Sequence, residues 1–143
     1  MFLASLLPNI TIHAFDTFES MPITSQYDTH KTGDFLVGTQ EVLDFLASKQ
    51  NIIAHKGVFP TTAAEIASNE KFSLVHIDVD IYQSVIDCLE FFYPRTVSGG
   101  FIISDDYGAK TCPGAFRGWN EFFLNKQEKT IYLSTGQSLV IKL

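Results

Sequence analysis

The sequence predicts a single α/β domain over residues 1–143, built on a mostly parallel sheet with an antiparallel hairpin at its C-terminal end. Three observations support this fold class. Short apolar runs rich in β-branched and aromatic residues alternate with stretches of helical periodicity. Two of these runs, in the segments 73–82 and 101–107, end in paired carboxylates. The runs at 130–133 and 138–141 are joined by a Ser-Thr-Gly-Gln turn, which is typical of a hairpin.

The first half of the chain predicts two strands, three helical segments and one long loop. Proline and glycine recur among polar residues in that loop, and a connection of this length inside a domain is often a lid or a binding loop. We expect the last turns of a helix at 2–7, stopped by Pro8, then a strand at 10–15 and the loop at 20–38. A helix opened by Gly38-Thr39 and a strand at 52–55 follow. A short helix to about residue 68 then starts with a Thr62/Glu65 capping box.

The second half predicts the two strands that carry the carboxylates, with a helix between them. We expect strands at 72–78 and from residue 101, a helix at 84–93, and a turn at Gly99-Gly100. A second helix follows the second carboxylate pair. Its apolar stripe is interpreted as core packing rather than as a cofactor-binding surface, and consists of Ala115, Phe116, Trp119, Phe122 and Phe123.

Composition and charge restrict the function classes. An apolar content of 45% and a charged content of 18% are typical of an ordinary globular protein. The net charge of -6 argues against nucleic acid as the main partner, because phosphate binding needs clustered Lys and Arg. No stretch approaches the roughly 18 apolar residues that a membrane span requires. We therefore expect neither a nucleic-acid nor a membrane partner.

The two cysteines do not form a disulfide framework. Cys88 lies on the apolar side of the helix expected at 84–93, which predicts a buried thiol, and Cys112 precedes Pro113-Gly114 in a loop, which predicts a free thiol. Neither has a nearby Cys or His at zinc-ligand spacing. A reducing compartment fits this usage best, so we expect a cytoplasmic protein.

Paired carboxylates at the ends of two strands are the main functional signal. In an open α/β sheet, ligands bind beyond the carboxyl ends of the strands, and adjacent strands would bring Asp78, Asp80, Asp105 and Asp106 to one edge. Carboxylates that cluster repel one another unless they bind a cation, share protons or stay hydrated. The pattern predicts a divalent-metal site, with a hydrated acidic loop as the alternative. Asp80 could instead cap the next helix.

Several residues near these carboxylates could take part in a site. His76 lies two positions before Asp78 and so points to the same side of the strand, either as a hydrogen-bonded core histidine or as a partner of the site. Tyr82 and Tyr107 flank the acidic edge, where aromatic side chains either line a pocket for a sugar or a ring, or simply pack. His30 in the long loop either contacts substrate or is exposed.

The strand at 10–15 ends in Asp16. An acidic residue in that place contacts the ribose hydroxyls in nucleotide-binding α/β folds, and it also occurs as a turn or helix cap. Both interpretations are open at this point.

Blocks of sequence spread over nearly the whole chain, in the right order, resemble the macrocin O-methyltransferase (TylF/MycF-like) family. The residues at 15–22 resemble its FD[ST]FEGLP block and those at 76–82 resemble its hxDxDLY block. The remaining similar blocks are Tyr93-Pro94-Arg95, Gly99-Gly100, Asp105 to Gly108, Cys112 to Ala115, and Thr135 to Leu139.

This resemblance implies a Rossmann-like class I methyltransferase fold that uses S-adenosylmethionine and Mg²⁺ to methylate a hydroxyl of a sugar or another small molecule. It implies that Asp78, Asp105 and Asp106 hold the metal, and that Asp78 is also the general base. It places Asp16 at the cofactor ribose. The neighbouring cofactor contacts that it implies are Thr17, Phe18 and Gly57, and the residues expected to line the substrate are Tyr82, Tyr107 and His76.

The chain departs from the family pattern at the cofactor site. The acidic, glycine-rich turn after a first strand is absent, and no Gly-x-Gly occurs in the sequence. In the family sheet that strand lies between the strands at 10–15 and 72–78, which would leave two unpaired edges. We expect either a late start of the chain, or a repair by direct pairing, by swapping or by assembly into a homo-oligomer.

This departure leaves three functions open. The first is the methyltransferase activity, impaired by the missing cofactor loop. The second is a non-catalytic, metal-binding or ligand-binding remnant of the same fold. The third is a metal-dependent hydrolase that uses the same aspartates.

Overall fold

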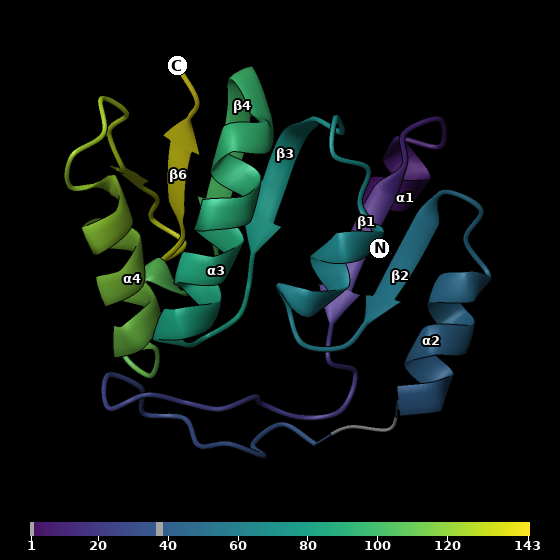
Figure 1. Ribbon diagram of the computed structural model, residues 1–143, viewed down its shortest axis with the longest axis horizontal. Helices are drawn as coiled ribbons and strands as arrows, with labels where there is room; N and C mark the ends of the chain where they lie inside the picture. Colours follow the sequence, from purple (N-terminus) through teal and green to yellow (C-terminus); the bar gives the residue numbers. More distant parts are fainter. Residues whose placement is uncertain (1, 37–38) are drawn as a thin grey trace. The chain divides into compact units, whose positions relative to one another are not determined.

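The computed structural model describes residues 2–36 and 39–143 (Figure 1). The chain divides into two units, each described here by itself. The N-terminal unit comprises Met1–Pro22 and Gly33–Glu65, and the C-terminal unit comprises Ile23–Thr32 and Ile66–Leu143. The segment predicted as one long loop at 20–38 therefore contributes to both units. Gly38, expected to open a helix, lies outside the described residues.

The N-terminal unit is a pair of parallel strands with a helix against one of them. Strand β1 (Ile12–Asp16) pairs with β2 (Ile52–Lys56), in a register that sets Ile12 opposite Ile52 and Asp16 opposite Lys56. Aromatic and imidazole rings stack across this pair of strands, and the ring centroids of Phe15 and His55 are 4.3 Å apart. The flanking elements are α1 (Phe2–Leu6), α2 (Thr39–Ala47), which packs on β2, and the short 3₁₀ helix η1 (Thr61–Glu65).

The C-terminal unit is a four-stranded sheet with two helices packed against each other (Figure 1). Its strand order is β3-β4-β6-β5, in which β3 and β4 are parallel and the last two strands form the predicted antiparallel hairpin. The elements are β3 (Phe72–Ile77), α3 (Tyr82–Phe92), η2 (Tyr93–Arg95), β4 (Thr96–Ser104), η3 (Asp106–Gly108), α4 (Pro113–Phe123), β5 (Ile131–Tyr132) and β6 (Ser138–Ile141).

The core of this unit lies between the sheet and the two helices. Leu89 of α3, Trp119 of α4 and Ile102 of β4 are fully buried, and the indole N–H of Trp119 donates to Thr130 Oγ1 at 2.9 Å. The predicted apolar stripe of α4 is confirmed as packing at Trp119 and Phe123, whereas Phe116 is half exposed. Among the described helices, none combines the length and the apolar character needed to cross a bilayer.

Two local predictions are wrong. The predicted capping box does not form, because Thr62 Oγ1 is buried without a hydrogen-bond partner. The Gly99-Gly100 pair does not make a turn before a strand; it lies inside β4, which already begins at Thr96. A Cβ on Gly100 would come within 2.9 Å of the Val97 carbonyl oxygen, so close backbone approach explains this glycine.

The strands expected to flank a missing strand belong to different sheets. β1 pairs with β2, and β3 pairs with β4. The parallel pairs and the C-terminal hairpin confirm the predicted α/β class.

Candidate functional site

Three of the four predicted carboxylates converge in the C-terminal unit. Asp78 directly follows β3, while Asp105 and Asp106 directly follow β4. The backbone N–H of Asp105 donates to the carbonyl of Ile77 at 2.9 Å, which holds the ends of the two strands together. One carboxylate oxygen of each aspartate lies within 4.8 Å of the others. The sheet therefore brings these side chains together as the sequence predicts.

Asp106 is the buried member of this cluster. Its Oδ2 accepts hydrogen bonds from the backbone N–H groups of Val79, at 3.2 Å, and Asp80, at 2.9 Å. Burial raises the pKa of the Asp106 carboxyl to about 6, and the negative charges of Asp80 and Asp78 add to the rise. The two backbone hydrogen bonds act in the opposite direction and lower the pKa. The charged form of Asp106 is therefore less favoured than that of an ordinary aspartate, and a nearby cation would favour it again.

Asp105 is oriented by two neighbours. Gln137 Nε2 donates to Asp105 Oδ1 at 2.6 Å, and His76 Nε2 lies 3.5 Å from the same oxygen. His76 is 43% exposed, so its interpretation as a core histidine is wrong, and it lies beside the carboxylate cluster. Gln137 was not predicted as a site residue; it directly precedes β6, which pairs with β4.

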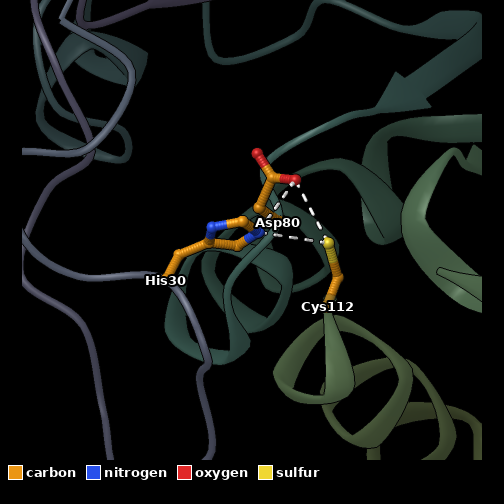
Figure 2. A group of neighbouring side chains, drawn as sticks. All are labelled: His30, Asp80 and Cys112. Carbon is orange, nitrogen blue, oxygen red and sulfur yellow. Dashed lines mark hydrogen bonds and ion pairs between the residues drawn. The ribbon is translucent and has the colours of Figure 1, made fainter. Parts of the chain in front are cut away.

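Asp80 does not belong to this cluster, and it does not cap α3. The residue at the N-cap is Ile81, and the N–H of Tyr82 is taken by Asp28 Oδ1 at 2.8 Å. Asp80 has a left-handed backbone with φ of 59°. Its Oδ1 accepts a hydrogen bond from the Cys112 thiol at 3.2 Å and lies 4.0 Å from His30 Nε2 (Figure 2).

The two tyrosines predicted to line the substrate differ in their surroundings. Tyr107 follows Asp106 and lines an open groove of about 510 Å³ whose other residues are Gly108, Ala109, Lys110, Pro113, Phe116 and Tyr132. Tyr82 is not among these lining residues. Its hydroxyl donates to Glu121 Oε2 at 2.7 Å, and its ring packs edge-on against Tyr27.

The residues predicted to bind the cofactor lie together in the N-terminal unit. The N–H of Gly57 donates to the carbonyl of Asp16 at 2.9 Å, at the ends of the parallel strands β1 and β2. Asp16 Oδ1 accepts the N–H of Phe18 at 2.7 Å and the Thr17 hydroxyl at 3.4 Å. The turn interpretation of Asp16 is therefore confirmed. The residue is also exposed, as a ribose-binding carboxylate must be.

The donor set of the carboxylate cluster fits Mg²⁺. This ion prefers oxygen ligands in an octahedral shell that it shares with water, and carboxylates supply such oxygens. Asp78 is exposed, Asp105 is half-buried and Asp106 is buried, so the cluster has both a closed side and an open side. A cation there would also favour the charged form of Asp106.

Comparison with known proteins finds one matching family model and a curated relative. The model of the macrocin-O-methyltransferase (TylF) family matches residues 3–130. A Streptomyces olivaceus protein, "8-demethyl-8-(2,3-dimethoxy-alpha-L-rhamnosyl)-tetracenomycin-C 4'-O-methyltransferase", is 39% identical over 49 residues, which are 34% of this chain and 19% of that protein.

Solved structures share the fold. The O-methyltransferase NovP superposes with a TM-score of 0.77 at 20% identity, over 97% of this chain and 62% of that one. The calicheamicin methyltransferase CalS11 superposes with a TM-score of 0.79 at 21% identity, over 97% of this chain and 65% of that one. The chain thus spans less than two thirds of the length of these relatives. On the family match over residues 3–130, the chain belongs to the macrocin-O-methyltransferase (TylF) family.

Proposed function

We propose that this protein transfers a methyl group from S-adenosylmethionine to a hydroxyl of a sugar-like small molecule, with Mg²⁺ bound by Asp78, Asp105 and Asp106. The convergence of these three carboxylates beyond the ends of β3 and β4 carries the proposal. The relatives support the substrate class. The S. olivaceus protein is named for a rhamnosyl-bearing acceptor, and a second CalS11 structure is titled as a TDP-rhamnose 3'-O-methyltransferase.

Each carboxylate has a role that follows from its surroundings. Asp106, held by two backbone N–H groups, and Asp105, held by Gln137, are fixed in place and suit metal binding. Asp78 is the exposed member and accepts the proton of the acceptor hydroxyl. A bound Mg²⁺ would supply a positive charge that makes this hydroxyl easier to deprotonate.

The acceptor binds in the groove that begins at Tyr107. Its aromatic residues Tyr107, Phe116 and Tyr132 offer flat apolar faces, which suit the C–H faces of a sugar ring. Lys110 lines the same groove and would favour an anionic substituent such as a phosphate. His76 lies beside Asp105. In this proposal its exposed imidazole faces the acceptor hydroxyl.

The methyl donor binds with its ribose at Asp16. The carboxylate stands at the carboxyl end of a parallel strand, where nucleotide-binding α/β folds hold ribose hydroxyls. Thr17 and Phe18 form the turn that orients it, and Gly57 brings the backbone of the adjacent strand end close.

The test combines binding and turnover on the full chain. Calorimetry with S-adenosylmethionine and S-adenosylhomocysteine in the presence of Mg²⁺ should show binding, and TDP-rhamnose should receive labelled methyl groups. Asp105→Ala should abolish transfer while S-adenosylhomocysteine still binds. Absence of cofactor binding with Mg²⁺ present would overturn the proposal. So would Mg²⁺-dependent phosphatase or esterase turnover that disappears in Asp105→Ala, because it would assign the aspartates to a hydrolase.

A further inference from the structure

A second group of metal-ligating side chains lies in the C-terminal unit, apart from the three-carboxylate cluster. Figure 2 shows that the side chains of His30, Asp80 and Cys112 point toward one another. They come from three places in the chain: the segment 23–32, the loop after β3, and the N-cap of α4. Their ligand atoms all lie within 4.8 Å of one another.

The distances fit a single small ion. Cys112 Sγ lies 3.7 Å from His30 Nε2 and 3.2 Å from Asp80 Oδ1, and the latter two atoms are 4.0 Å apart. In a tetrahedral site with bonds of roughly 2.0–2.3 Å, neighbouring ligand atoms lie about 3.3–3.8 Å apart. The three observed separations are close to this range, so shifts of a few tenths of an ångström would place the three atoms on one face of a tetrahedron around an ion.

The backbone around these ligands is held by hydrogen bonds. Asp28 accepts the N–H of Tyr82 through Oδ1, at 2.8 Å, and the N–H and hydroxyl of Ser25 through Oδ2, both at 2.7 Å. These bonds tie the segment that carries His30 to the start of α3. The Asp106 carboxylate accepts the N–H of Asp80, and this bond fixes the backbone that carries the Asp80 carboxylate. A positioned ligand set needs little reorganisation when an ion binds.

Burial leaves one side of the group open. Cys112 is only 3% exposed, whereas the side chains of His30 and Asp80 are 17% and 29% exposed. A closed sulfur side with an accessible nitrogen and oxygen is the arrangement of a site with three protein ligands and a fourth position for water or another ligand.

We propose that His30, Asp80 and Cys112 form a site for a divalent transition metal ion of the zinc type, distinct from the Mg²⁺ site. Imidazole nitrogen and thiolate sulfur suit a borderline-soft ion, whereas Mg²⁺ prefers oxygen ligands only. The zinc-type ion therefore prefers the group with nitrogen and sulfur ligands, and Mg²⁺ prefers the three-carboxylate cluster. Asp78 and Asp80, two positions apart, serve different ions, because the left-handed backbone at Asp80 turns its carboxylate to another group.

Binding replaces one proton by the metal. Without an ion, the Cys112 thiol keeps its proton and donates a hydrogen bond to Asp80 Oδ1. The Sγ–H bond breaks when the ion binds, the proton leaves to solvent, and sulfur, nitrogen and carboxylate oxygen each donate a lone pair to the metal. No oxidant or reductant takes part.

Cobalt(II) titration of the full chain tests this site directly. One equivalent of Co²⁺ should produce a near-ultraviolet thiolate-to-cobalt charge-transfer band together with the visible bands of a tetrahedral ion. Zn²⁺ should remove these bands, and excess Mg²⁺ should not. Cys112→Ser should lose the charge-transfer band, and His30→Gln should weaken Zn²⁺ binding by about tenfold or more.

Two control variants separate this proposal from the proposed function. Cys88→Ser removes the other thiol, which is buried on α3, and should leave the cobalt spectrum unchanged. Asp105→Ala should weaken Mg²⁺ binding and retain the cobalt site. The proposal is overturned if folded wild-type protein gives no stoichiometric band, if the band survives in Cys112→Ser, or if folded His30→Gln binds Zn²⁺ as tightly as wild type. Either of the first two results would leave His30, Asp80 and Cys112 as a hydrogen-bonded group only.

Discussion

The carboxylate of Asp106 accepts a hydrogen bond from the backbone N–H of Asp80 at 2.9 Å, and this bond links the two acidic loops of the C-terminal unit. It fixes the loop after β3 against the loop after β4. Two aspartates that are close in sequence have different partners on either side of this bond. Asp78 groups with Asp105 and Asp106, whereas Asp80 groups with His30 and Cys112. Because burial raises the pKa of Asp106, its ionisation makes a pH-dependent contribution to the stability of this arrangement.

Asp106→Asn should remove a pH-dependent part of the stability. Burial raises the Asp106 pKa from 3.8 to about 6, so the folded state holds this proton more tightly than the unfolded state. The free energy of unfolding therefore falls as pH rises from about 4 to about 6, by roughly 1–3 kcal/mol on account of this group. Urea unfolding of both proteins in EDTA, at pH 4 and pH 8, should show this loss in wild type and a smaller loss in Asp106→Asn. Equal losses would contradict the prediction.

Magnesium should stabilise the protein more at pH 8 than at pH 5. Below pH 6 a growing share of Asp106 is protonated, and a neutral carboxyl is a poor ligand for a hard cation. Thermal unfolding with and without Mg²⁺ at the two pH values measures the difference. Asp105→Ala should lose the Mg²⁺-dependent shift at both pH values. An equal shift at pH 5 and pH 8 in wild type would place the ion elsewhere.

The three-carboxylate cluster could be predicted because it follows from a general property of parallel sheets. Asp78 and Asp105 each come directly after a buried strand, and the carboxyl ends of adjacent parallel strands meet at one edge. Gln137 could not be assigned in the same way, since its place depends on the antiparallel register that sets Ser138 opposite Ser104. That register follows from tertiary pairing rather than from local pattern.

The group of His30, Asp80 and Cys112 was missed for a similar reason. Cys112 and His30 are 82 positions apart, far outside the spacing of local metal-binding motifs. His30 reaches the group because Asp28, in the same segment, accepts the N–H of Tyr82, and these two residues are 54 positions apart. No local spacing in the sequence indicates this contact. The Gly99-Gly100 error has a local cause, because a glycine pair is compatible with a turn and with close backbone approach inside a strand.

Glu128→Gln should destabilise the C-terminal unit at neutral pH by about 2 kcal/mol. Burial opposes the charged form of Glu128, yet hydrogen bonds from its own backbone, Lys142, Tyr93 and the Leu143 N–H lower its pKa to about 2. The stabilisation from this depressed pKa is complete above about pH 4.5 and is lost as pH falls toward 2.

Chemical unfolding of wild type and Glu128→Gln between pH 3 and pH 7 measures this effect, and the difference between the two proteins should shrink toward pH 3. Glu121→Gln is the matched control. Glu121 also pairs with a basic side chain, Arg117, but both are exposed, so its loss should have a much smaller effect. A Glu128→Gln protein as stable as wild type at pH 7 would contradict the prediction.

Gly114→Ala should weaken the zinc-type site without affecting Mg²⁺ binding. A Cβ at this position would collide with the Asp28 carboxylate and would lie 2.9 Å from the Tyr82 nitrogen. Asp28 would have to move and give up its bond to Tyr82, which releases the segment that carries His30. We expect a loss of about 1–3 kcal/mol in the free energy of unfolding, together with weaker Co²⁺ binding.

Gly118→Ala, four positions later on the same helix, is the control for this change. Its Cβ would lie 3.1 Å from the Tyr82 carbonyl oxygen, with the next atoms at ordinary contact distances, so a small shift accommodates it. The gain in helix propensity from Gly to Ala, up to about 1 kcal/mol, offsets part of that strain. Cobalt titration and hydrogen exchange at the Tyr82 amide compare the two variants. Unchanged protection of that amide in Gly114→Ala would show that Asp28 does not hold the segment in place.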